Sequence, residues 1–92
     1  MTTYIDYYKG ICTLSLVGVF KPDIALLELE RIIYMKVILI DLSECYMYSK
    51  ADLNWLVNKF EKKTIYIKSK YKYIKSDFIY VNSIFNLLNN NI

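Results

Sequence analysis

The sequence of 92 residues contains no histidine, only two glycines, one proline and two cysteines, Cys12 and Cys45. Without histidine the chain lacks the commonest acid–base group near neutral pH, and it lacks the Cys/His clusters that hold zinc. No glycine-rich, phosphate-cradling loop is present. We therefore expect a protein that is not an enzyme and that holds neither a metal nor another cofactor.

Long hydrophobic runs are also absent. The apolar runs 11–20 and 37–40 are both too short to cross a bilayer, so we expect no membrane span. Cys12 and Cys45 could form one disulfide, but Cys12 lies within an apolar run, and we favour two reduced, inert thiols in a cytoplasmic protein. Lys50 is the one basic residue near Cys45, which argues against a nucleophilic role for that thiol.

Large apolar side chains are plentiful. Hydrophobic residues make up 55% of the chain, and ten tyrosines and four phenylalanines add large buried areas per residue. Such burial offsets the conformational entropy that a short chain loses on folding. We expect residues 1–92 to form a single domain.

The first third of the chain predicts a hairpin followed by a helix. Residues 3–8 and 11–20 are β-prone and are separated by Lys9-Gly10, which is typical of a tight turn. Gly18 indicates a bulge or a close backbone approach. A helix is expected over 22–33, because proline is favoured in the first helical turn.

The middle of the chain predicts a central strand and a second helix. Residues 36–43 are apolar without alternation, which is typical of a strand covered on both faces. Residues 44–48 are expected to form a loop. Ser49 and Asp52 resemble a capping box, and a helix is expected from there to about residue 62. Its buried side has the i, i+3, i+4, i+7 spacing and consists of Leu53, Leu56, Val57 and Phe60.

Residues 64–68 and 78–81 favour two further strands, and 84–88 favour a terminal helix. The span 70–77 stays open between a strand extension and a helical turn. Helices and strands alternate from residue 11 onward, so we expect the α/β class, with a single-layer mixed sheet of four to five strands and helices packed on it.

Three landmarks carry a resemblance to a known family. They are the run 13–20 with Leu16-Val17-Gly18, the strand 37–43 that ends in Asp41-Leu42-Ser43, and the helix opening at Ser49 with Leu53. This pattern resembles the STAS domain of bacterial anti-sigma factor antagonists and sulfate transporter tails. The resemblance implies a STAS-like fold and a regulatory protein in a bacterial cytoplasm that meets its partner at the start of the second helix.

The resemblance also implies a difference in regulation. Ala51 stands where the family carries its phosphorylated serine or threonine, so that switch cannot operate at this position. Ser49 is a possible phosphosite two residues away, although we favour an ordinary helix cap for it.

We expect the partner-binding surface at the start of the second helix. Trp55 points away from the leucine side of that helix, and Ala51 shares its direction. An alternative is that the chain's own loop or terminus covers the indole. The expected surface consists of Tyr48, Ser49, Lys50, Ala51, Asp52 and Trp55. Two partner classes are implied by the resemblance: an anti-sigma kinase-like regulator, or a subunit of an ABC lipid-transport complex.

A basic stretch is the other candidate surface. Seven lysines against one glutamate give +6 over residues 59–75. Lys68, Lys70 and Lys72 would share one side of a continued strand and could bind single-stranded nucleic acid or acidic lipid. We favour a solvated strand edge whose lysines prevent aggregation. Asp41, Glu44 and Asp52 gather near the end of the expected central strand, where we interpret Asp41 as a structural residue that accepts backbone N–H bonds.

Overall fold

The computed structural model describes residues 1–60, 63–69 and 79–80. These residues form two helices and six strands. In chain order they are β1 (Thr2–Tyr8), β2 (Ile11–Val19), α1 (Pro22–Ile32), β3 (Val37–Asp41), β4 (Cys45–Tyr46), α2 (Lys50–Asn58), β5 (Ile65–Lys68) and β6 (Ile79–Tyr80).

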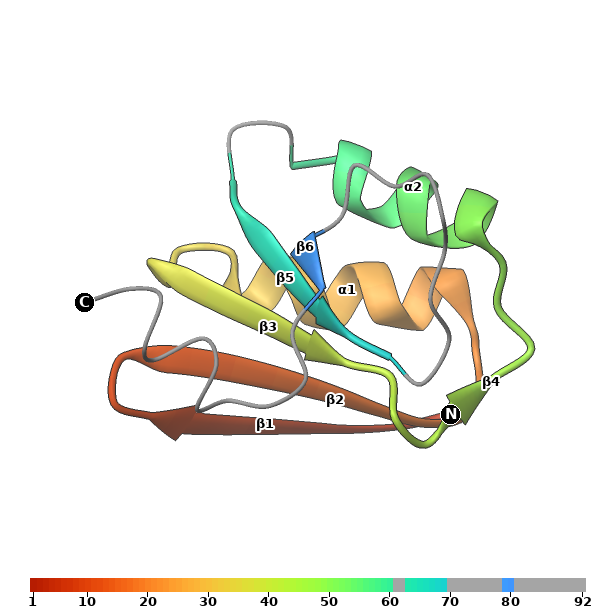
Figure 1. Ribbon diagram of the computed structural model, residues 1–92, viewed down its shortest axis with the longest axis horizontal. Helices are drawn as coiled ribbons and strands as arrows, with labels where there is room; N and C mark the ends of the chain where they lie inside the picture. The colour runs from red at the N-terminus through yellow and green to blue at the C-terminus, as the bar shows by residue number, and fades with distance from the viewer. Residues whose placement is uncertain (61–62, 70–78, 81–92) are drawn as a thin grey trace.

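The strands form one mixed sheet in the order β1-β2-β3-β5-β6 (Figure 1). β1 runs antiparallel to β2, whereas β2, β3, β5 and β6 run parallel to one another. β3 lies in the middle of this order, which confirms the central strand predicted over 36–43. The predicted α/β class with a mixed sheet is confirmed as well.

Both helices pack on the same face of the sheet. The chain passes from β2 through α1 to β3, and from β3 through α2 to β5, so it moves each time to the next strand in one direction. Right-handed crossovers in a constant direction place their helices on the same side. α1 and α2 consequently contact each other and share one core with the sheet (Figure 1).

That core is built from alternate residues of the parallel strands. Side chains on the helix-covered face are 0–4% exposed, and the helices add Ala25, Leu29, Ile32, Leu53 and Leu56. The contributing strand residues are Cys12, Leu14, Leu16, Ile38, Ile40, Ile65 and Ile67.

β3 is also buried on its other face, as its unbroken apolar run predicts. Leu39 is 2% exposed there and forms a second, smaller cluster with Ile11, against which Val37 and Tyr66 pack. The central strand is therefore apolar along its length because both of its faces are covered.

Two glycines hold backbone conformations that other residues adopt at a cost. Lys9 and Gly10 have φ of 48° and 82°, as a two-residue turn of type I′ requires, and they join β1 to β2. Gly18 has φ of 100°, and its N–H donates to the Glu44 carbonyl at 3.0 Å. A Cβ added at Gly18 would meet no atom nearer than the Met1 Cα, at 3.8 Å, so the positive φ and not a crowded backbone explains this glycine.

The prediction of a loop over residues 44–48 is wrong for two of them. Cys45–Tyr46 form β4, which pairs in parallel with Gly18 and Val19 at the end of β2. This pairing joins segments 27 residues apart in the chain, and the short stretch itself carries no strand pattern.

The remaining predicted helices and strands are shorter in the structure than expected or lie outside the described residues. α1 ends at Ile32 and α2 at Asn58, each earlier than expected. The predicted strand at 78–81 is present as the two residues of β6. The open span 70–77 and the expected helix 84–88 lie outside the described residues. Within the described part of the chain, no helix is both long and apolar enough to cross a bilayer.

The core predicts a strong response to truncation at its centre. Ile40 is fully buried in the core cluster to which both helices contribute, so Ile40→Ala should lower the free energy of unfolding by about 2–5 kcal/mol. Leu27→Ala on the outer side of α1, where Leu27 is 59% exposed, should change it little. Urea denaturation of both variants measures this, and equal losses would contradict the assignment of the core.

Candidate functional site

α2 begins with a reciprocal cap. The Ser49 hydroxyl accepts a hydrogen bond from the Asp52 N–H at 3.1 Å, and the Asp52 carboxylate accepts one from the Ser49 N–H at 2.9 Å. The capping box predicted from the sequence is therefore present. It satisfies two backbone donors and fixes the first turn of the helix.

α2 turns its leucine side into the core, as predicted. Leu53 and Leu56 are fully buried, and Val57 and Phe60 pack partly buried against the same cluster. Ala51 and Trp55 lie on the other side of the helix, and Trp55 keeps 38% of its surface exposed.

The Trp55 indole is held in place from one side. The Lys59 ammonium lies 5.1 Å from the centre of the ring, four residues along the helix. A lysine over an indole face is a cation–π contact, which limits the orientations of both side chains. The indole is thus an ordered, partly exposed feature of the surface.

Tyr48 has a different environment from the other predicted partner-binding residues. Its ring packs edge-to-face on Phe20 with 6.1 Å between ring centres, and its hydroxyl shares a hydrogen bond with the Ser69 hydroxyl. Tyr48 therefore ties the start of α2 to the end of β5. Ser49 and Asp52 are engaged in the cap, Lys50 is half-buried, and Ala51 and Trp55 present exposed side chains.

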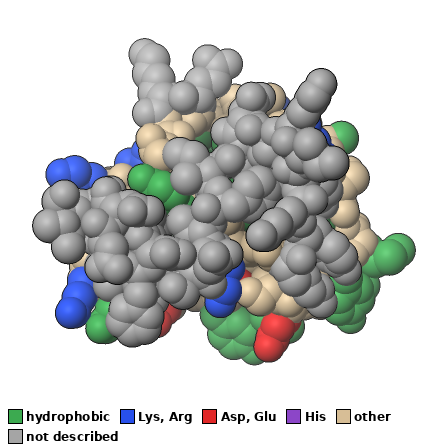
Figure 2. Space-filling model, viewed as in Figure 1, with side chains coloured by type: hydrophobic (Ala, Val, Ile, Leu, Met, Phe, Trp, Pro, Cys, Tyr) green, Lys and Arg blue, Asp and Glu red, His purple; other side chains and the backbone are tan. Residues whose placement is uncertain are grey.

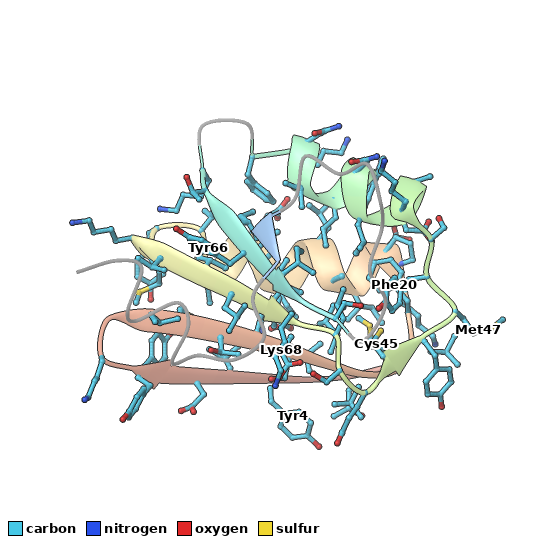
Figure 3. The ribbon with its side chains drawn as sticks, viewed as in Figure 1. Tyr4, Phe20, Cys45, Met47, Tyr66 and Lys68 are labelled. Atoms are coloured by element: carbon cyan, nitrogen blue, oxygen red, sulfur yellow. The ribbon has the colours of Figure 1, made fainter. Side chains whose placement is uncertain are left out.

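The structure adds exposed apolar residues that the sequence reasoning missed. Tyr46 is 49% exposed and Met47 is 78% exposed, immediately before α2. β4 pairing places Tyr46 beside Val19, which is 46% exposed. Met47 has φ of 64° and points away from the body of the molecule (Figure 3). Two apolar residues in an expected loop do not by themselves predict an exposed apolar surface. The surface forms only because β4 pairs with β2.

We name Tyr46, Met47, Ala51 and Trp55 the α2 entry surface. Its members come from β4, from the residue that follows it and from the outer side of α2. In the space-filling view, hydrophobic side chains gather along the lower and right-hand rim of the molecule, the rim toward which Met47 points (Figures 2 and 3). Tyr46 and Met47 lie at the end of the sheet where β2 and β4 finish, and Ala51 and Trp55 lie on α2.

A polar row crosses the sheet face opposite α1 and α2. The strand registers align Tyr4, Ser15, Asp41 and Lys68 across β1, β2, β3 and β5. The row borders a hollow of about 380 Å³ that is also lined by Ser43 and Glu44. Figure 3 labels Tyr4 and Lys68, two of the residues that line this hollow.

Asp41 organises the row. One carboxylate oxygen accepts hydrogen bonds from the Ser43 N–H, at 2.9 Å, and from the Ser43 hydroxyl. The other lies 3.9 Å from the Lys68 ammonium. The structural role predicted for Asp41 is thus confirmed. Glu44 lines the same hollow, whereas the third carboxylate of the expected group, Asp52, belongs to the cap of α2.

The interpretation of Lys68 as part of a solvated strand edge is wrong. β5 pairs with β3 on one side and β6 on the other, so it is an internal strand, and Lys68 forms an ion pair on the sheet face. Lys70 and Lys72, the other two members of the expected basic patch, lie outside the described residues. Within the described residues, no group of three or more His, Cys, Asp or Glu side chains is placed to hold a metal ion.

The sequence matches no protein-family model, and it matches no curated protein. The STAS resemblance therefore stays a prediction that rests on the three sequence landmarks.

The cap of α2 yields a first prediction for this region. Ser49→Ala removes the hydroxyl acceptor of the Asp52 N–H and should lower the free energy of unfolding by about 1 kcal/mol. Ser49→Asp keeps an acceptor at the same position and should retain most of the stability. Thermal unfolding of the two variants measures the difference, and equal loss in both would show that the hydroxyl is not the capping group.

The thiols yield a second prediction. Cys12 and Cys45 are both free and fully buried, and burial raises the pKa of each thiol above its ordinary value. Because the thiolate is the reactive form, both should react with a disulfide reagent far more slowly in the folded protein than in urea at the same pH. Comparison of the two labelling rates checks this, and a thiol labelled at the unfolded rate would place it outside the core.

Proposed function

We propose that this protein is a non-enzymatic interaction module that binds a protein partner through the α2 entry surface. The observation that carries the proposal is the exposed Trp55, placed opposite the buried leucines of a capped helix, with Ala51 one turn before it. Tryptophan is enriched among the residues that dominate interface energies, and a small neighbour leaves room for a partner side chain.

The rest of the surface supports the same function. Met47 and Tyr46 supply flexible and aromatic apolar area next to the first turn of α2. Methionine adapts its shape to a partner, and tyrosine combines an apolar ring with a hydrogen-bonding group. The capping box and the contact of Tyr48 with Phe20 hold this end of α2 rigid, which reduces the entropy lost on binding.

The partner class follows from the STAS resemblance. We propose an anti-sigma kinase-like regulator in a bacterial cytoplasm, with a subunit of an ABC lipid-transport complex as the second class. Phosphorylation at the family position does not regulate this binding, because Ala51 has no hydroxyl. Phosphate on Ser49 would stand beside the Asp52 carboxylate that now closes the cap, so it would repel that group and weaken the first turn of α2.

Three variants test the proposal in an affinity capture from native cells with quantitative mass spectrometry. A partner captured by the wild type should be lost about tenfold or more with Trp55→Ala and with Met47→Asp, because each removes a large apolar contact. Leu27→Asp is the matched control, since Leu27 is a similarly exposed apolar residue on α1.

Met47→Asp also distinguishes loss of binding from loss of folding. The Met47 side chain is 78% exposed, so this variant should melt at the wild-type temperature. Capture that survives both substitutions at the α2 entry surface, or that Leu27→Asp reduces equally, would overturn the proposal.

A further inference from the structure

β1 is an edge strand with unusual exposure of large side chains. Among the described strands it pairs with β2 alone. Four of its seven residues are large apolar or aromatic residues with 37–59% of their surface exposed, and the strand contains neither lysine nor proline. These four are Tyr4, Ile5, Tyr7 and Tyr8. Long apolar edge strands that contain neither lysine nor proline readily pair with another strand.

The turn between β1 and β2 determines which backbone groups of β1 face outward. In a two-residue hairpin the residues flanking the turn, here Tyr8 and Ile11, form a hydrogen-bonded pair. Alternate residues of β1 then bond to β2, and those between them direct N–H and C=O away from it. The outward residues are Thr3, Ile5 and Tyr7.

A separate hydrogen bond agrees with this assignment of the outward-facing residues. The Tyr7 N–H donates to the carboxylate of its neighbour Asp6 at 3.0 Å, so it is not used in the ladder with β2. Asp6 thereby occupies the Tyr7 N–H, which is one of the outward-facing donors of β1. The other outward-facing backbone groups belong to Thr3 and Ile5. Such a carboxylate protects the edge, yet the bond is exposed and is readily exchanged for another.

We propose that β1 pairs with β1 of a second copy of this chain, antiparallel and about a two-fold axis at Ile5. Ile5 then lies opposite Ile5 of the second copy, and Thr3 lies opposite Tyr7. All three outward residues of both copies form hydrogen-bonded pairs, and the sheet continues from one copy into the other. The proposed interface is centred on Ile5 and lies on the side of the molecule away from α2 (Figure 1), whereas β4, which carries Tyr46, lies near the N-terminal end of β1.

Neighbouring registers fit less well. Registers that keep outward residues opposite one another differ by two positions. A shift toward the turn places Asp6 opposite Asp6 of the second copy, and like charges directly opposite each other destabilise a sheet. A shift the other way leaves Tyr7 opposite Met1, outside the strand. The register centred on Ile5 instead places Asp6 opposite Tyr4, whose hydroxyl is a hydrogen-bond donor.

A backbone variant tests the pairing. Ile5→Pro removes an N–H that faces outward and leaves the bonds of β1 to β2 intact, because proline is tolerated where an edge strand faces solvent. Ile5→Thr is the control, since it also shortens the side chain but keeps the N–H. Sedimentation equilibrium of the full chain should show a wild-type dimer, and Ile5→Pro should weaken it about tenfold or more beyond the effect of Ile5→Thr.

Cross-linking tests the register. Ile5→Cys places two thiols opposite each other at the proposed axis, at a separation that a disulfide spans, whereas Thr3→Cys places them about four residues apart along the strands. Thr3 lies opposite Leu16 in β2, so a thiol there has no native cysteine across from it. Under mild oxidation Ile5→Cys should form a covalent dimer and Thr3→Cys should not. The native thiols are buried and serve as an internal control.

Each opposite result overturns the proposal. A wild-type chain that sediments as a monomer at its highest soluble concentration excludes the self-pairing. Equal dimerisation by Ile5→Pro and Ile5→Thr shows that a dimer uses another surface, and cross-linking through Thr3→Cys in preference to Ile5→Cys excludes the register. Circular dichroism confirms that each variant retains its fold.

Discussion

Seven buried side chains project from one face of β2, β3 and β5, and their removal from water under both helices is the condition on which the rest of the structure depends. Parallel strands cannot be joined by tight turns, so each pair requires a crossover, and right-handed crossovers in one direction place α1 and α2 side by side. Apolar burial and chain connectivity therefore lead to the same two-layer arrangement.

This one-sided arrangement determines which parts of the molecule stay available. The opposite face of the sheet is partly polar, and there Asp41 holds Ser43 and Lys68 beside the hollow. α2 has one side in the core, so its other side carries Trp55 toward solvent. β1 stands at the end of the described sheet, joined by the antiparallel hairpin, and no crossover helix is needed to reach it.

The two proposed surfaces share no residue, although β4 lies near the N-terminal end of β1. The α2 entry surface lies at the end of β4 and along α2, and the proposed self-pairing uses the far edge of the sheet at β1. A two-fold axis through Ile5, perpendicular to the sheet, would keep the helices of both copies on the same side. Such a dimer would present two α2 entry surfaces, and a partner with paired sites would gain affinity from engaging both.

The sequence by itself determined the features that neighbouring residues specify. The hairpin turn at Lys9-Gly10, the doubly buried strand at 37–41 and the capping box of Ser49 all follow from residue type and short spacing, and so does the outward side of α2. Only the tertiary structure decided that Cys45–Tyr46 form a strand, that Lys68 pairs with Asp41, and that β1 is an edge of the described sheet whereas β5 is internal. The physical reason is that these features depend on which distant segments pair, and hydrophobic periodicity reports whether a face is buried without naming the strand beside it.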